Sequence, residues 1–472
     1  MSAPHWQSAN ELAALIRTGQ LKSVELVEVL LARIAKLDPS VNAFIRCDAE
    51  EARRAALAAD AEIADGRYRG PLHGIPVGIK DVIDVQGLPT TCHSKVRLDH
   101  VAAEDATAVA RLRQAGAIIL GKLSTHEFAL GGPSFDLPFP PARNPWNADH
   151  HPGGSSSGSG AGLAAGFFPL ALGTDTGGSV RNPASMCGVV GLKPTYGLVS
   201  RRGVFPLAYT LDHVGPMARS VADIALLLDI IAGHDPADVS SVTGTGTKGA
   251  NAKGSYGHML DKGVANLRIG YVRHFHETDM PADPAVAQAL DRVAEAMAGE
   301  GAKIVEARLP DLNAFSSVNR IILQAEAWAI HAPWLRERPQ DYGASGRRRL
   351  LAGAFLTAED YVMAQRRRAT MIAAVEAVMG EVDLLLTASA MDPACRIDDE
   401  ATLQRTYPRQ ARTPFNVTGH PAIAMMAGLS ADGLPLSVQF VGRHFDEATV
   451  LRAAAAWERI GGWQDRHPPA FA

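Results

Sequence analysis

Two Gly/Ser-rich turns between residues 153 and 184 hold the residues of this 472-residue chain that are best suited to chemistry. The first turn places Ser155 after Gly153-Gly154, and the second places Ser179 after Gly177-Gly178. Because glycine has no Cβ, backbone N–H groups in such turns can approach a ligand closely. Acyl transfer needs an exposed nucleophile beside N–H donors for the developing oxyanion. The pattern therefore predicts a hydrolase.

A Gly/Ser-rich segment is also typical of a flexible linker, and GGSSSGSG alone does not separate the two interpretations. The residues that follow do separate them. Residues 160–172 are almost wholly apolar, which fits a small-residue helix packed inside a core and ending near Pro169. Residues 189–192 then predict a buried strand. Both serine turns are therefore expected inside a folded core.

These residues resemble the signature of the amidase signature family, the Ser–cis-Ser–Lys hydrolases. The matching letters are GSSSG at 154–158, then Gly173, Asp175, Gly177, SVR at 179–181 and PA at 183–184. The similarity continues in GIPVGIKD at 74–81, GLKPTYG at 191–197 and DHVGP at 212–216, and more weakly in DLLLT at 383–387 and PLSVQ at 435–439. The resemblance covers nearly the whole chain, most tightly from about 70 to 220.

The resemblance implies a catalytic role for three residues. Ser179 is the expected nucleophile, Ser155 is the bridging serine after a cis Gly154–Ser155 peptide, and Lys80 is the base. A serine hydroxyl becomes a good nucleophile only when a neighbouring base takes its proton. Lysine can be that base only when neutral, which burial favours, and the apolar residues between 77 and 83 supply such surroundings.

The remaining signature residues are expected to assist. Thr176, Gly177 and Gly178, together with Ser179, are expected to present backbone N–H groups to the oxyanion, where one donor is typically worth about 10²–10³-fold in rate. Supporting or substrate-binding positions are expected at Gly154, Ser156, Asp175, Arg181, Thr125 and Phe128. Of these, Asp175 and Arg181 are interpreted mainly as structural partners of the turn. The resemblance implies no metal and no cofactor.

The substrate pocket is expected to come from remote segments. Residues 123–128 read LSTHEF, where relatives often have Thr-Asn after the lysine at 122. This segment, with 129–135, the residues around 315–328 and Tyr361, is expected to line the acyl pocket. The aromatic residues there, which are Phe128, Phe135, Phe139 and Trp328, favour a hydrophobic or aromatic substrate.

Three functions compete. The preferred prediction is a stand-alone amidase that hydrolyses the C–N bond of a small aryl or alkyl amide, with carbamates or esters as further substrates; segments 207–213 and 123–128 favour it. The alternative is the glutaminase (A) subunit of a tRNA-dependent amidotransferase, which carries the same signature and works with a partner chain. A Ser-His-Asp hydrolase is disfavoured, because no G-x-S-x-G elbow stands at a suitable strand-to-helix turn.

Composition bounds the surroundings in which the chain works. Its formal charge of −4 argues against nucleic-acid or anionic-membrane surfaces. Four cysteines lack metal or disulfide spacing, and no secretory signal or run of about 20 apolar residues is present. We therefore expect a cytoplasmic enzyme that acts on a small amide and water, has no nucleic-acid or membrane partner, and forms a homodimer.

Strand and helix patterns alternate along the chain. Helices are predicted at 9–19, 23–37, 49–64, 105–115, 220–233, 283–298, 359–379 and 446–460, with Asp105 as a cap, and strands at 117–120, 267–272 and 303–306. This alternation predicts an α/β fold with a mostly parallel sheet covered on both faces. The resemblance adds a mixed, twisted sheet of about eleven strands in one domain spanning 1–472, with a long flexible loop at about 239–258.

Overall fold

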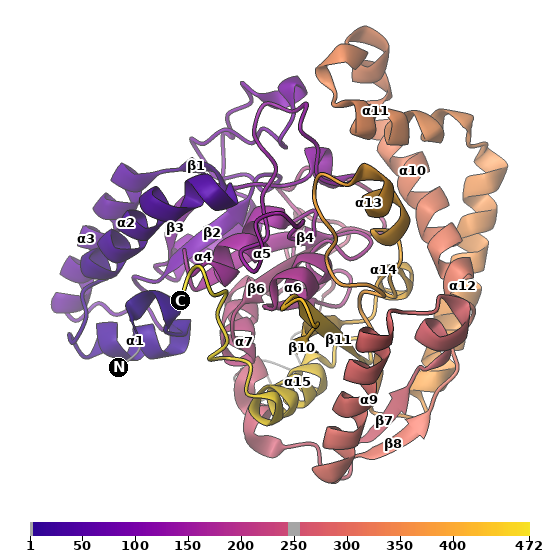
Figure 1. Cartoon of the computed structure of the whole chain (residues 1–472). Helices are drawn as coiled ribbons and strands as arrows, with labels where there is room; N and C mark the ends of the chain where they lie inside the picture. Colours follow the sequence, from indigo (N-terminus) through magenta and orange to yellow (C-terminus); the bar gives the residue numbers. More distant parts are fainter. Residues whose placement is uncertain (1–2, 244–254) are drawn as a thin grey trace.

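An eleven-stranded sheet forms the centre of the protein, in a computed structural model that describes residues 3–243 and 255–472. The strand order is β1-β3-β2-β4-β6-β5-β10-β11-β9-β7-β8 (Figure 1). The strands are β1 (Phe44–Cys47), β2 (Pro76–Lys80), β3 (Ile118–Leu123), β4 (Leu170–Asp175), β5 (Val190–Lys193), β6 (His213–Ala218), β7 (Arg268–Tyr271), β8 (Lys303–Glu306), β9 (Leu384–Ala388), β10 (Ala422–Leu429) and β11 (Pro435–Gly442).

The sheet is mixed, as the resemblance implies. Strand β2 runs parallel to both β3 and β4, and β7 runs parallel to β8 and β9. The other six pairings of the described strands are antiparallel, so the sheet is less parallel than the sequence pattern suggests. For one of these pairings the physical reason is that β10 and β11 form a hairpin, and a short connection of this kind joins antiparallel strands without a crossover helix.

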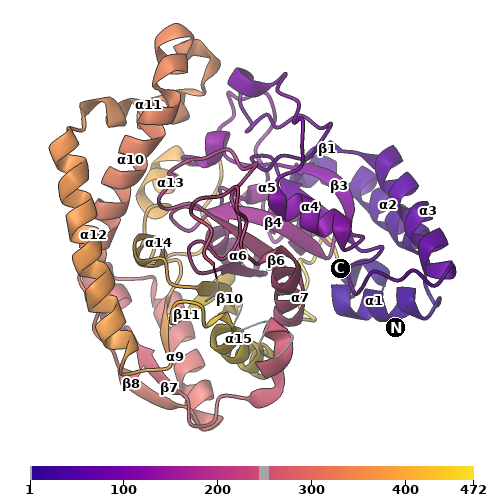
Figure 2. The same ribbon diagram turned by 180° about the vertical axis from the view of Figure 1, so that it is seen from behind.

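Helices flank the sheet (Figures 1 and 2). They are α1 (Ala9–Arg17), α2 (Ser23–Val41), α3 (Ala49–Ala64), α4 (Thr107–Gln114), α5 (Ser157–Ala164), α6 (Arg181–Cys187), α7 (Val221–Ile231), α9 (Pro284–Gly299), α10 (Leu312–Glu337), α11 (Ala344–Leu351), α12 (Ala358–Met379), α13 (Glu400–Thr406), α14 (Thr413–Thr418) and α15 (Glu447–Gly461). The long helices α10 and α12 run side by side at the side of the molecule away from α2 and α3 in both views.

Local sequence signals explain several helix starts. Ser8 and Glu11 form the reciprocal capping box that opens α1, and Ser220 caps α7. Asp283 caps α9, whose first residue is Pro284. Asp105, in contrast, does not cap α4: its carboxylate accepts a hydrogen bond from Gln86 N–H and pairs with Arg113, and the helix begins at Thr107.

The structure tests the predicted flexible loop and the predicted absence of a membrane span only over the described residues. Residues 244–254 of the predicted flexible loop lie outside the described residues, while its end carries a 3-10 helix at Tyr256–Lys262. Among the described residues, no helix is long and apolar enough to cross a membrane. A single-domain organisation over 1–472 and a cytoplasmic location stay predictions.

Candidate active site

Lys80 lies at the end of a completely buried strand, β2, beside the parallel strand β4. Parallel neighbours end at the same edge of a sheet, so Lys80 on β2 and Thr174 near the end of β4 are brought together. Lys80 Nζ lies 2.6 Å from Ser155 Oγ and 2.8 Å from Thr174 Oγ1. The sheet therefore supplies the contact between the predicted base and the predicted bridging serine, which are 75 residues apart in the chain.

Burial changes the proton affinity of this lysine. Lys80 is fully buried, and the loss of water lowers the pKa of its ammonium from its usual range to about 7, although the nearby Asp175 and Asp212 carboxylates act in the opposite direction. At pH values above 7 the amine is therefore mostly neutral and able to accept a proton. This is the state that a lysine base requires.

The Ser155 turn is held in an unusual backbone form. The Gly154–Ser155 peptide bond is cis, as the resemblance implies. A Cβ added to Gly154 would lie 2.2 Å from the buried His126 ring, so only glycine fits at this position. His126 N–H donates to the Ser155 carbonyl at 3.1 Å, and α5 begins two residues later. These contacts aim Ser155 at Lys80.

The second turn carries Ser179 and is tied to the first. Ser156 N–H donates to the Ser179 carbonyl at 3.1 Å, and Ser156 Oγ lies 3.3 Å from both the N and the O of Thr174. Gly177 and Ser179 have backbone N–H groups without a partner among the described residues. Gly178 N–H, however, donates to Asp175 Oδ1 at 2.8 Å, so the structure does not leave this predicted oxyanion donor free.

Asp175 and Arg181 form a buried network that holds this turn. The Arg181 guanidinium is completely buried and donates to both Asp175 carboxylate oxygens, to Asn416 Oδ1, to Gln439 Oε1 and to the Arg412 carbonyl. Every N–H group of the side chain is thereby used within the protein. The structural interpretation of Asp175 and Arg181 fits this geometry, and Arg181 has no donor left for a substrate.

A cavity of about 520 Å³ opens in front of Ser179. Its lining comes from residues 129–131, from Gly154, from the turn 176–179 and from segments far along the chain, including α10 and residues 404–413. Because Ser179 is the predicted nucleophile and lies on this surface, a substrate reaching it must occupy this space. The segment around residues 315–328, which is expected to line the pocket, lies on α10 and does contribute lining residues.

Arginines give this cavity a positive character. Arg320, Arg348, Arg349 and Arg412 line it, and no aspartate or glutamate is among its described lining residues. Arg320, Arg348 and Arg349 form no ion pair with another described residue. Arg412 is almost fully buried, and a Cβ on Gly178 would lie 2.5 Å from its Nε. The cavity therefore suits a substrate that bears a carboxylate.

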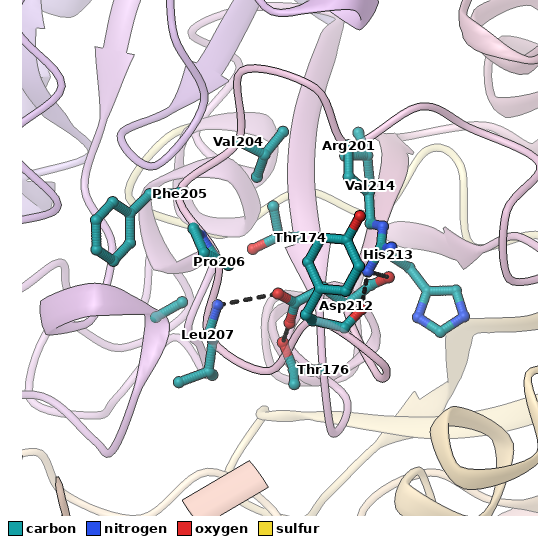
Figure 3. A pocket seen from close by; sticks show the side chains of 12 residues that line it. Thr174, Thr176, Arg201, Val204, Phe205, Pro206, Leu207, Asp212, His213 and Val214 are labelled. Atoms are coloured by element: carbon teal, nitrogen blue, oxygen red, sulfur yellow. Dashed lines mark hydrogen bonds between the residues drawn. The ribbon is translucent and has the colours of Figure 1, made fainter. Parts of the chain in front are cut away.

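A smaller cavity of about 70 Å³ lies beside Thr174, whose hydroxyl contacts Lys80 (Figure 3). Thr174, Thr176 and Asp212 lie at its wall, and Thr176 Oγ1 donates to Asp212 Oδ1 at 2.6 Å. Burial raises the pKa of Asp212 to about 6. The wall is mixed, because Val204, Phe205 and Leu207 line it together with the two threonines and Asp212. Asp212 thus ties the 207–212 segment to the predicted oxyanion turn.

The structure does not bring every predicted site residue to the large cavity. Phe128 is buried against Phe205, His331, Trp334 and Tyr342. Thr125 is also buried, and its hydroxyl donates to the His126 carbonyl. Trp328 and Tyr361 do not line this cavity either. Phe128, Trp328 and Tyr361 are therefore not part of its wall, whereas Phe135 lines a neighbouring cavity of about 490 Å³ that shares Arg348, Arg349 and Tyr407 with it. Phe128 departs from the prediction because an apolar side chain in a mixed sequence pattern more often packs into the core.

Sequence reasoning missed the arginines of the wall. The sequence has arginine runs at 347–349 and 366–368, a pattern typical of solvated helix faces, yet Arg348 and Arg349 line the cavity. Arg412 gave no signal in the sequence, because its position beside Gly178 arises only when α14 packs near the nucleophile turn.

The chain is similar to known amidotransferase subunits over almost its whole length. It is 38% identical to the A subunit of the glutamyl-tRNA(Gln) amidotransferase of Roseiflexus sp. (strain RS-1), with 99% of each chain covered. The crystal structure of the subunit of that name from Thermotoga maritima matches with a TM-score of 0.80 and 32% identity, covering 97% of this chain and 96% of that one. A chain from a vestigial protein complex, described as revealing the origins of an s-triazine catabolic enzyme, matches with a TM-score of 0.88 and 33% identity, covering 96% and 99%.

These comparisons correct two predictions. The preferred function, a stand-alone amidase of small aryl or alkyl amides, is contradicted because relatives 37–39% identical are named as A subunits of an amidotransferase. The predicted absence of a nucleic-acid partner is contradicted by the same name. The first prediction rested on segments 123–128 and 207–213, which position the site within the fold and do not distinguish a stand-alone enzyme from a subunit. The second rested on the net charge of the chain, which averages over all surfaces and does not describe any one of them. The homodimer stays a prediction.

A sequence model described as amidase matches residues 25–451. That match spans the base, both serine turns and the arginine-lined wall. The chain therefore belongs to the amidase family, as an enzyme of the hydrolase type with the amidase signature fold.

Proposed function

We propose that this chain is the glutaminase (A) subunit of a tRNA-dependent amidotransferase. In this role it hydrolyses the side-chain amide of glutamine and releases ammonia, which a partner subunit uses to amidate a tRNA-bound glutamyl group. The observation that carries the proposal is the near full-length similarity to subunits of that name, in a chain that has Lys80 and Ser155 in contact.

Acylation uses the proton path between the two serine turns. Ser179 Oγ attacks the amide carbon, while its proton passes through Ser155 to neutral Lys80. The carbonyl oxygen becomes an oxyanion that accepts from the free N–H groups of Gly177 and Ser179. The C–N bond then breaks, the proton returns through Ser155 to the leaving nitrogen, and ammonia departs from a glutamyl ester on Ser179.

Deacylation repeats the path with water. A water molecule attacks the ester carbon, and Lys80 takes one of its protons through Ser155. When the tetrahedral intermediate collapses, the C–O bond to Ser179 breaks and the proton returns to Ser179 Oγ. Glutamate leaves and Lys80 is neutral again, so the cycle consumes one glutamine and one water and yields glutamate and ammonia.

The charge of the cavity supports a substrate such as glutamine over a neutral amide. Glutamine carries an α-carboxylate at the end opposite the reacting amide, and guanidinium groups recognise carboxylates through paired hydrogen bonds. Arg320, Arg348 and Arg349 are available for this purpose. Neutral oxygens on the same wall, at Asn319 and Gln324, can accept from the α-ammonium.

The test measures both halves of the proposed reaction. The purified chain is supplied with L-glutamine, and ammonia is followed with and without the remaining subunits of the amidotransferase and glutamyl-tRNA(Gln). We expect glutamine-dependent formation of glutaminyl-tRNA only in the complete mixture, and its loss in Ser179→Ala. Hydrolysis of neutral amides without any hydrolysis of glutamine in the complete mixture would overturn the proposal.

A further inference from the structure

Three potential metal ligands from separate segments converge on the side of the molecule that carries α12. Glu376 lies on α12, His420 follows α14 and His444 follows β11. Their ligand atoms all lie within 4.8 Å of one another. Glu376 Oε1 is 2.5 Å from His444 Nδ1 and 3.4 Å from His420 Nε2. None of the three lines the cavity at Ser179.

The hydrogen bonds of His420 leave a lone pair at the centre of this cluster. His420 Nδ1 lies 2.9 Å from Thr418 Oγ1, and that hydroxyl donates its own hydrogen to the Pro414 carbonyl at 3.0 Å. His420 Nδ1 must therefore carry the hydrogen, and Nε2 is left as an acceptor. The side chain is completely buried, and Nε2 has no hydrogen-bond partner. Nε2 lies 3.4 Å from a carboxylate oxygen of Glu376.

His444 also has one ring nitrogen that carries a hydrogen and one that is left as an acceptor, but the two nitrogens exchange roles. Its Nε2 lies 2.9 Å from the Thr418 carbonyl, which can only accept, so Nε2 carries a hydrogen. In a neutral ring, Nδ1 then presents a lone pair to Glu376 Oε1. With neutral rings, three acceptor atoms thus face one another with every ring N–H committed to Thr418, an arrangement that is repulsive unless a proton or a metal ion lies between them.

We propose that Glu376, His420 and His444 bind one divalent transition-metal ion of the zinc type. Two imidazoles and one carboxylate form a ligand set that zinc uses in proteins, with a water in the fourth position. Tetrahedral bonds of about 2.0–2.1 Å place ligand atoms roughly 3.3 Å apart, which the His420 Nε2–Glu376 Oε1 distance of 3.4 Å already matches. Ligating histidines in proteins typically donate the other ring N–H to a carbonyl or similar acceptor, as Thr418 allows here.

The ligands differ in how freely they can adjust. His420 is completely buried, whereas the side chains of His444 and Glu376 are 27% and 45% exposed. The two imidazole rings are stacked, with centroids 3.9 Å apart and planes 24° from parallel. Because a nitrogen lone pair lies in the plane of its ring, metal binding tilts the exposed His444 ring out of the stack, and Glu376 moves back by about 1 Å.

The ion would link one helix to two loops of the fold. Glu376 is near the end of α12, His420 lies between α14 and β10, and His444 lies between β11 and α15. Helix α14 also carries Asn416, which accepts from Arg181 in the network that holds the nucleophile turn. This role goes beyond the proposed function: it is a structural site, and its test needs no measurement of amide hydrolysis.

The test is metal binding to the intact, metal-stripped chain. Zn²⁺ is titrated by equilibrium dialysis, and Co²⁺ is used as a spectroscopic probe, because four-coordinate Co²⁺ absorbs visible light much more strongly than the hydrated ion. We expect one Zn²⁺ or Co²⁺ per chain, the strong Co²⁺ absorption, and a thermal midpoint that rises with added Zn²⁺.

Variants show whether these residues hold the ion. Since His420 is buried, the exposed ligands carry the test: we expect Glu376→Gln to weaken Zn²⁺ binding at least tenfold and His444→Asn at least a hundredfold. His100→Asn, which removes an exposed histidine elsewhere, is the matched control and should bind like the wild type. Absence of Zn²⁺ and Co²⁺ binding by the wild type would mean that a proton alone joins His444 to Glu376. That result, or unchanged binding in both variants, overturns the proposal.

Discussion

The serine turns at 153–184 and the wall formed by α10, α11 and residues 404–413 face the same cavity but are held in place by different means. The turns are buried except at Gly177 and Ser179, which reach the cavity, and a saturated network around Arg181 fixes them to the sheet. The wall comes from segments far apart in the chain and presents arginines without ion-pair partners among the described residues. The predicted bond-breaking groups are thus part of the core, whereas the arginines proposed to select the substrate lie on α10, on α11 and at the start of α14.

The largest effect should come from the core side. Ser179→Ala removes the proposed nucleophile, so we expect glutamine hydrolysis to fall by at least about 10⁴-fold. Ammonia release under saturating glutamine measures the loss. Ser316→Ala, which removes a hydroxyl on the α10 part of the same cavity wall, should keep most of the activity. Equal losses in the two variants would remove the distinction between the regions.

The base should give a smaller loss and a diagnostic pH profile. Lys80→Met keeps the buried stem but removes the amine, and we expect a loss of about 10²–10⁴-fold. In the wild type the amine must be neutral to accept a proton. Activity should therefore be high above pH 7 and should decrease as the pH falls through about 7, where Lys80 becomes protonated. A rate that stays constant from pH 8 to pH 5 would argue against Lys80 as the base.

Stability separates the regions in a different way. Arg181→Met leaves the buried Asp175 carboxylate without its partner, and we expect unfolding to become easier by about 3–5 kcal/mol. Arg320→Gln on the wall should change stability by less than about 0.5 kcal/mol, because its side chain is exposed and unpaired. Urea denaturation measures both values. Similar values for the two variants would contradict the network as the element that holds the turn.

The smallest effect should come from single wall arginines. An Arg–carboxylate hydrogen bond is worth about 1.5–3 kcal/mol, so Arg320→Gln or Arg349→Gln should raise the KM for glutamine roughly tenfold or more with little change in kcat. Arg367→Gln on the exposed face of α12 is the control. An unchanged KM in both wall variants would show that the carboxylate is recognised elsewhere.

The sequence predicts the serine turns better than it predicts the wall of the cavity. The pairing of Lys80 with Ser155 and the cis peptide at Gly154 were predictable, because a long residue pattern accompanies this local geometry. The helices predicted at 9–19 and 283–298 likewise begin within one residue of α1 and α9, since a helix start depends on residues within one turn. The helix starts depend only on neighbouring residues. The contact between Lys80 and Ser155 joins residues that are far apart in the chain, but a recognisable residue pattern accompanies it.

Features that depend on packing between remote segments were not predictable. The 26-residue helix α10 was anticipated only as a pocket segment, and nothing in the sequence places Arg412 beside Gly178. Phe128 was assigned to the pocket but packs into the core. The partner was also misjudged, because stand-alone enzymes and amidotransferase subunits can share one hydrolytic site and differ on surfaces that residue spacing does not reveal.

The most direct test of the account compares two substrates in the complete amidotransferase mixture. The value of kcat/KM for ammonia release is measured with L-glutamine and with benzamide, a neutral aryl amide. The arginine-lined cavity and the proposed function predict that glutamine is preferred by at least about a hundredfold, and that Arg349→Gln narrows the gap. Equal or better turnover of benzamide would contradict the account.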